Sequence, residues 1–198
     1  MSGDRVYEII LTDNNITGSL PSSISNLDGL HNLNLNRNSI SGTLPTELYG
    51  LTSLNYIYLA ENSLSGVLSP DFGNLINLRH LFINGNALTS TIPSTFQNLA
   101  NIQLLGLSSN LLTGEVPVEI FNLTTLTALY LDYNELSGSI GSSITNLINL
   151  EEIALEHNNF SGTFPDLTGL NNLRHLRAFN CNFSGAFPEA NWQLPALT

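Results

Sequence analysis

The sequence repeats itself every 24 residues, and no other feature constrains its fold as strongly. Residues 30–45, LHNLNLNRNSISGTLP, show the unit: spaced leucines, an asparagine, then serine, glycine and proline. Units with such a period pack on their neighbours and build a solenoid. We therefore expect one array of eight repeats over residues 1–198. The anchoring residues are Asn14, Asn38, Asn62, Asn86, Asn110, Asn134 and Asn158, with Cys181 in the eighth place.

The pattern inside one repeat predicts a strand, a turn and a short helical segment. Alternation such as Leu33-Asn34-Leu35 indicates a strand with its leucines inward, and successive strands should stack in parallel. The asparagine that follows can satisfy backbone groups in a turn. The Ser/Thr-Gly-x-x-Pro segment predicts a further turn. Segments such as residues 22–27 are too short for a full helix, so we expect 3₁₀ turns there.

Charge and cysteine content exclude several classes of protein. The net charge is −11, with no lysine, which argues against nucleic acid and anionic membranes as partners. No apolar run reaches the roughly 20 residues of a membrane span. No signal peptide is recognisable, which suits a mature, trimmed or cytosolic chain. The single cysteine excludes an internal disulfide.

Four Asn-x-Ser/Thr sequons favour a secreted chain, although a sequence this rich in asparagine, serine and threonine also produces them by accident. They are candidate glycosylation sites, at Asn15, Asn122, Asn159 and Asn182.

Segments such as residues 16–21, ITGSLP, and 64–68, LSGVL, resemble the plant-type leucine-rich repeat family over residues 5–197. That family includes receptor-kinase ectodomains, receptor-like proteins and polygalacturonase inhibitors. The resemblance implies an α/β solenoid: a right-handed superhelix with parallel strands on its concave face and short 3₁₀ turns and loops on its convex face. It also implies a peptide, protein or glycan ligand on the sheet surface.

The cysteine-paired caps usual at both ends of that family are missing here. We therefore expect a fragment of a larger extracellular or cell-surface protein. The alternative is end-to-end self-association through uncapped ends.

The outward strand positions differ from repeat to repeat, and large aromatic residues gather over the third to sixth repeats. Exposed aromatics beside small residues such as Gly85 and Gly106 are typical of a binding hot spot. The alternative is that the rings stack across strands for stability alone. The candidate ligand-binding residues are Tyr56, Tyr58, His80, Phe82, Leu104, Tyr130, Asp132, Tyr133 and Glu156.

Other chemistry has weaker support. No set of nucleophile, base and orienting residue is readable, so we expect neither an enzyme nor a cofactor. Asp132, Glu156 and His157 could supply metal ligands but lack a spacing motif, so no metal site is expected. Asp13, Arg37 and Glu61 form a column that indicates only a surface charge ladder.

A column of hydroxyl residues would suit an ice-binding surface, but the plant-type pattern has this hydroxyl in any case. Its members are Thr17, Ser41, Ser65, Thr89, Thr113, Ser137, Ser161 and Ser184. We therefore predict a non-enzymatic recognition module most like a receptor ectodomain. The alternatives are a secreted enzyme inhibitor or adhesion protein, and an ice-binding protein.

Overall fold

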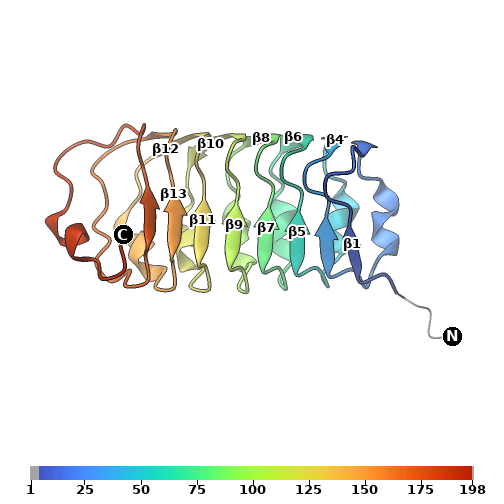
Figure 1. Ribbon diagram of the computed structural model, residues 1–198, viewed down its shortest axis with the longest axis horizontal. Coiled ribbons are helices and arrows are strands. Elements are labelled where there is room, and N and C mark those ends of the chain that lie inside the picture. Colours follow the sequence, from blue (N-terminus) through green and yellow to red (C-terminus); the bar gives the residue numbers. More distant parts are fainter. Residues whose placement is uncertain (1–4, 198) are drawn as a thin grey trace.

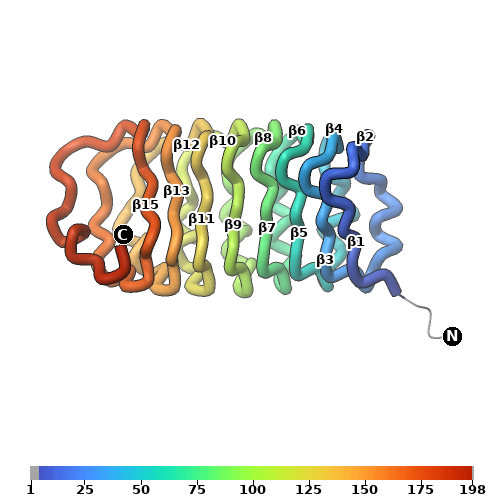
Figure 2. The backbone as a smooth tube through the Cα atoms, viewed as in Figure 1, coloured from blue at the N-terminus to red at the C-terminus, as the bar shows by residue number. Residues whose placement is uncertain are grey.

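The computed structural model describes residues 5–197, which form a stack of similar coils. Figure 1 shows the strands side by side along the long axis, and Figure 2 traces the same coils through the backbone. The inward side chains of all coils pack into one continuous core. The predicted solenoid is confirmed.

One strand from each repeat joins an eight-stranded parallel sheet. The register sets Leu81 beside Ile57 on one side and Leu105 on the other, and all three are fully buried, as predicted for inward positions. The strands are β1 (Glu8–Ile10), β3 (Asn32–Asn34), β5 (Tyr56–Tyr58), β7 (His80–Phe82), β9 (Leu104–Gly106), β11 (Ala128–Tyr130), β13 (Glu152–Ala154) and β15 (His175–Arg177).

A second, seven-stranded parallel sheet corrects the predicted turn in the Ser/Thr-Gly segment. The chain runs extended as far as the glycine, where φ becomes positive, for example +87° at Gly66. The hydroxyl column helps to hold these strands, because Thr89 donates to the Gly66 carbonyl of the preceding repeat at 3.1 Å. The strands are β2 (Thr17–Gly18), β4 (Ser39–Gly42), β6 (Ser63–Val67), β8 (Ala87–Ser90), β10 (Leu111–Glu115), β12 (Glu135–Gly138) and β14 (Asn159–Phe160).

The anchoring asparagine ties the two sheets together. Asn110 Nδ2 donates to the carbonyls of Ile83 and Leu107 at 3.0 and 3.1 Å, and its Oδ1 accepts from the Leu88 amide at 3.0 Å. Ile83, directly after β7, and Leu88, in β8, belong to the preceding repeat, so one side chain links the end of a strand of the first sheet to the second sheet across a repeat boundary. The same kinds of contact recur at Asn38, Asn62, Asn86, Asn134 and Asn158.

The predicted burial of these asparagines holds for only part of the array. Asn110 and Asn134 are buried, whereas Asn62 and Asn86 are half-buried. In the eighth repeat the Cys181 thiol donates to the Leu155 carbonyl at 3.2 Å, and burial raises the pKa of that thiol. The thiol thus keeps one of the hydrogen bonds that the asparagine amide makes elsewhere.

The predicted 3₁₀ turns cover the side opposite the eight-stranded sheet (Figure 1). The shortened seventh repeat lacks such a turn at residues 166–170, and Asn191 compensates by accepting from the Leu167 amide at 2.7 Å. No helix within residues 5–197 is long and apolar enough to cross a membrane. The turns are η1 (Ser22–Asn26), η2 (Thr46–Gly50), η3 (Pro70–Asn74), η4 (Ser94–Asn98), η5 (Val118–Asn122), η6 (Ser142–Asn146) and η7 (Glu189–Gln193).

Candidate functional site

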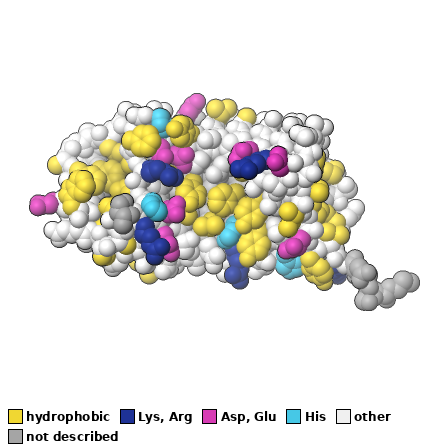
Figure 3. Space-filling model, viewed as in Figure 1, with side chains coloured by type: hydrophobic (Ala, Val, Ile, Leu, Met, Phe, Trp, Pro, Cys, Tyr) yellow, Lys and Arg dark blue, Asp and Glu magenta, His cyan; other side chains and the backbone are white. Residues whose placement is uncertain are grey.

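The outward side of the eight-stranded sheet, here called the strand face, carries the residues that the sequence singles out. Figure 3 shows hydrophobic side chains near the middle of this face, between groups of acidic and basic side chains. Five aromatic and imidazole rings form one connected group there, which we call the aromatic run. Its members are Tyr56, Tyr58, His80, Phe82 and Tyr130.

The rings of the aromatic run lie at distances typical of favourable aromatic pairs. The ring centroids of Tyr56 and His80 are 5.0 Å apart, and those of Tyr58 and Phe82 are 5.8 Å apart. Phe82 and Tyr130 are 6.2 Å apart although β9 lies between their strands. The run therefore continues from β5 to β11.

Small residues between the large ones explain this continuity. The register sets Phe82, Gly106, Tyr130, Ala154 and Arg177 on successive strands. Gly106 and Ala154 are buried. A Cβ at Gly106 would lie 2.7 Å from the Phe82 ring and 2.5 Å from Asn84 Oδ1. The absence of a side chain at Gly106 thus lets Phe82 and Tyr130 approach each other.

Hydrogen bonds fix the orientation of the rings. Tyr58 Oη lies 2.6 Å from His80 Nδ1. Burial lowers the pKa of His80 and raises that of Tyr58, so burial favours the neutral form of both partners in this hydrogen bond. Tyr130 donates to Glu152 Oε2 at 2.7 Å, and burial together with that carboxylate raises the pKa of Tyr130 to about 12. Both tyrosines therefore remain protonated at neutral pH.

A hollow of about 530 Å³, the strand-face hollow, lies beside the aromatic run. The rings of Phe82 and Tyr130 line part of it, and its remaining lining is polar. Its other lining residues are Glu61, Asn84, Gly85, Ser108, Ser109, Asp132, Glu152 and Arg177.

Carboxylates with few donors lie beside the strand-face hollow. Glu156 is only 5% exposed, and its Oε1 lies 3.1 Å from Arg177 Nε. Its Oε2 is buried and has no hydrogen-bond partner among the described residues. Asp132 accepts a hydrogen bond from the Ser108 hydroxyl. The site therefore holds more acceptors than donors.

The predicted site residue Tyr133 lies in a separate cluster. Its ring stacks on His157 at 4.1 Å, and His157 meets Phe179 edge-on at 5.2 Å. Tyr133 is 50% exposed and Phe179 55%. Leu104, another predicted site residue, is half-buried and pairs in register with His80 of the aromatic run. The structure thus divides the predicted site into the aromatic run, the strand-face hollow and this second cluster.

Several residues of the strand-face hollow are absent from the sequence-based list. Asn84, Ser108 and Arg177 line the hollow, although none of them is aromatic. The alternation of large and small residues from Phe82 to Arg177 was the available signal, because a large side chain leans over a small neighbour.

The remaining candidates have local partners. Arg37 Nε lies 3.4 Å from Glu61 between exposed side chains, a pair that contributes little stability. No group of three His, Cys, Asp or Glu side chains in the described part of the chain is placed to hold a metal ion.

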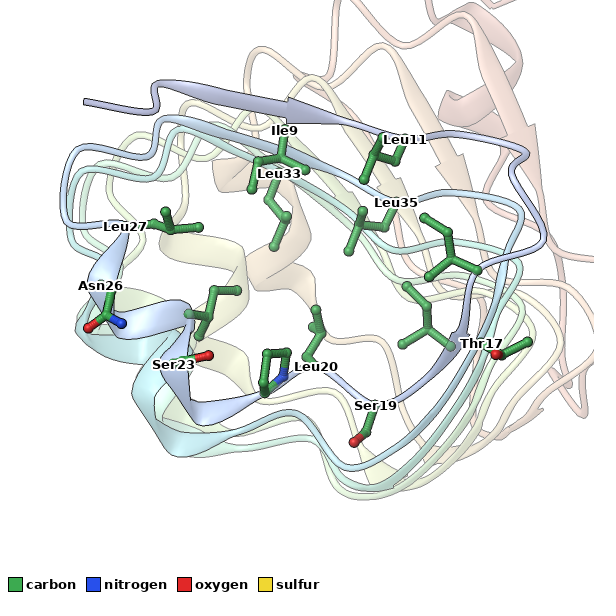
Figure 4. A pocket seen from close by; sticks show the side chains of 14 residues that line it. Ile9, Leu11, Thr17, Ser19, Leu20, Ser23, Asn26, Leu27, Leu33 and Leu35 are labelled. Atoms are coloured by element: carbon green, nitrogen blue, oxygen red, sulfur yellow. The ribbon is translucent and has the colours of Figure 1, made fainter. Parts of the chain in front are cut away.

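A second hollow, of about 490 Å³, lies inside the coil at the β1 end of the array. Figure 4 shows Ile9, Leu11 and Leu20 pointing into it from the first repeat. Its lining is mainly apolar because inward core positions form it.

Comparison with known proteins agrees with this architecture. The family description "Leucine rich repeat" matches residues 4–64, and "Leucine-rich repeat region" matches residues 61–193. No match was found among curated proteins.

Solved structures of plant receptors superpose closely on the chain. The ectodomain of the Arabidopsis thaliana receptor kinase GASSHO1/SCHENGEN3, in complex with CASPARIAN STRIP INTEGRITY FACTOR 2, has a TM-score of 0.95 and 31% identity, over 97% of this chain and 23% of that one. The plant peptide hormone receptor RGFR1, in complex with RGF2, has a TM-score of 0.94 and 34% identity, over 96% and 31%. The chain thus spans less than a third of either receptor.

A plant ice-binding protein is also similar, with a TM-score of 0.77 and 29% identity over 90% of this chain and 58% of that one. The family matches together extend over most of the sequence, and the receptor ectodomains share its coils. The chain belongs to the leucine-rich repeat family and is of the plant type.

Proposed function

We propose that this chain is a non-enzymatic recognition module of a plant-type receptor and that it binds a peptide on its strand face. The aromatic run carries the proposal, because it gathers large rings outside the core next to a polar hollow. Tyrosine is enriched among residues that dominate binding energy, and rings flanked by a polar hollow offer both apolar contact and orientation.

The similar receptors support a peptide rather than another ligand. GASSHO1/SCHENGEN3 was solved with CASPARIAN STRIP INTEGRITY FACTOR 2, and RGFR1 is a peptide hormone receptor solved with RGF2. An extended peptide can follow the long axis of the strand face and contact several strands in turn. A protein or glycan ligand would use the same rings and is an alternative outcome of the binding test.

The same receptors support a location outside the cell. The four sequons agree with it, because Asn15, Asn122, Asn159 and Asn182 are all exposed. Deglycosylation of the secreted protein, followed by mass spectrometry, tests this part of the proposal. Expression in a secreting plant host should give glycan masses on at least one sequon.

Ice is the second candidate ligand, because a plant ice-binding protein shares the fold and the hydroxyl column is regular. Hydrogen bonds of the column weigh against it, because Thr89 and Ser184 already donate to glycine carbonyls.

Alanine variants test the peptide site directly. Peptides would be selected from a random displayed library against the whole chain, and their affinities measured. Replacing Tyr58, Phe82 or Tyr130 by alanine should weaken binding at least about tenfold, because each ring loses apolar contact worth more than ~1.4 kcal/mol. Tyr7→Ala, at an exposed tyrosine outside the aromatic run, serves as the matched control and should leave affinity unchanged.

Thermal melts of each variant separate lost binding from lost folding. Full affinity in the triple variant would place the ligand elsewhere on the array. Failure to select any peptide would remove peptide recognition from consideration and leave the protein and glycan alternatives.

A further inference from the structure

The strand-face hollow owes its depth to small side chains in the fourth and fifth repeats. Gly85 and Ser109 line it where neighbouring repeats carry Glu61 and Tyr133, and Ser108 lines it where the next repeat carries Asp132. The rings of Phe82 and Tyr130 form its apolar side. A long side chain with an apolar stem can therefore enter the hollow and lie against the two rings.

The polar part of the hollow lacks donors. Asn84 Oδ1 is buried without a hydrogen-bond partner among the described residues. The same holds for Glu156 Oε2, in a side chain that is almost completely buried beside Arg177. A buried acceptor without a donor raises the free energy of the unbound protein. Both atoms are closed off from solvent, so they strengthen the preference of the hollow for a positively charged group without contacting that group themselves.

The charge around the hollow is negative. Asp132, Glu152 and Glu156 lie beside Arg177, whose Nε lies 3.1 Å from Glu156, and Glu152 also lies 3.7 Å from His175 Nδ1. On the opposite side Glu61 already pairs with Arg37 at 3.4 Å. The charges of Glu152 and Asp132 also contribute to the raised pKa of Tyr130. One guanidinium and one imidazole cannot neutralise three carboxylates, so a further cation is favoured.

From these observations we infer that the strand-face hollow binds one lysine or arginine side chain of the peptide ligand. The ammonium or guanidinium group meets Asp132 and Glu152, which both line the hollow, and the stem lies against Phe82 and Tyr130. Arg177 limits the affinity by its like charge. This inference rests on the proposed function and names the chemistry that the peptide must present.

Two small probes of equal shape test the inference. Capped arginine amide carries the guanidinium, whereas capped citrulline amide replaces it with an uncharged urea. Each probe would be titrated into the isotopically labelled whole chain, and NMR would follow the amide signals of Gly85, Gly106 and Ser108. The arginine probe should give saturable shifts, and the citrulline probe should bind at least about fivefold more weakly.

Variants with opposite expected effects sharpen the test. Asp132→Asn keeps the shape and removes one charge, so it should weaken the arginine probe at least about fivefold. Arg177→Gln removes the like charge and should tighten binding. Glu119→Gln, at a half-buried residue of turn η5 that does not line the hollow, is the matched control and should change nothing. Thermal melts establish that each variant is folded.

Equal binding of the two probes, no saturable shift at these amides, or an unchanged affinity in Asp132→Asn would overturn the inference. The proposed function would be judged separately. Library peptides that depend on Tyr58 and Phe82 but contain no enriched basic residue would sustain peptide recognition and reject the cation subsite.

Discussion

The two sheets of the array run through the same repeats, yet they present different surfaces. Along the seven-stranded sheet and just beyond its last strand, every repeat has a serine or threonine at the same position. Several of these hydroxyls bond to a glycine carbonyl of the preceding repeat. The eight-stranded sheet instead presents rings, small residues and charges. One of its outward columns contains Tyr58, Phe82, Gly106, Tyr130, Ala154 and Arg177.

The difference shows how packing restricts sequence. A hydroxyl that bonds to the preceding repeat, or a glycine at positive φ, meets the same demand in every coil. An outward side chain on the strand face meets no such demand, so its identity can follow a partner. Uniform composition therefore marks the scaffold, and irregular composition marks the surface available for recognition.

The largest loss of stability is expected from changes in the core that both sheets share. Leu105 in β9 and Leu112 in β10 are both fully buried. Alanine at either position should cost about 2–5 kcal/mol, because each leaves a cavity in the same core. Leu111→Ala, at a side chain that is 47% exposed, is the control. Chemical denaturation measures all three, and a cost confined to one sheet would show that the sheets do not share a core.

A smaller loss should follow from cutting the link between the sheets. Asn110→Ala removes the amide that bonds to Ile83, Leu88 and Leu107, leaving buried backbone groups without partners. We expect a loss of about 1–3 kcal/mol in unfolding free energy. The exposed Asn101, which donates one hydrogen bond to Ile76, offers a matched alanine control. Equal losses in the two variants would contradict the linking role.

At one position of the second sheet, a residue other than glycine stands where the other repeats have glycine. Replacing it by glycine should increase the stability of the protein. Ser90 adopts φ +79°, where Gly66 and Gly114 stand in neighbouring repeats at +87° and +76°. Ser90→Gly should stabilise the protein by about 0.5–1 kcal/mol, because the Cβ is strained there. The reverse change, Gly66→Ser, should destabilise it, since an added Cβ would lie 2.7 Å from Thr43 Cγ2. Thermal melts of the two variants measure the expected increase and the expected decrease in stability.

We expect the chain to have no effect on the growth of ice. If the second sheet is scaffold, a thermal-hysteresis assay of the purified chain should show no activity. If the chain were active and Thr89→Tyr and Thr113→Tyr abolished that activity, the uniform surface of the second sheet would be the functional surface and not the strand face. The similar plant ice-binding protein provides the positive control.

The sequence predicted those parts of the fold that every repeat demands. Inward residues such as Leu81 and the anchoring asparagines recur with the period, so burial and bonding could be read from it. The second sheet could not be read, because its extended path depends on bonds between repeats, such as Leu88 N–H to Asn110 Oδ1.

The candidate site was readable only in part. Tyr58, Phe82 and Tyr130 are close because strand order and alternation place them on one surface. The sequence does not indicate the contact between Arg177 and Glu156, because the two residues occupy different outward positions of the repeat and only the length of the arginine side chain brings them together. Tyr133 shares the surface with those rings but stacks on His157 instead, after its strand has ended.

A single mutation at Gly106 can disrupt the packing of the aromatic run. A glycine codon becomes an alanine codon through a single nucleotide change, and the new methyl group would collide with Phe82 and Asn84. The neighbouring leucines, which face the other way, would be untouched. A duplicated gene can therefore lose or regain this surface in one mutational step while it keeps its scaffold, so related copies can diverge in ligand preference faster than in architecture.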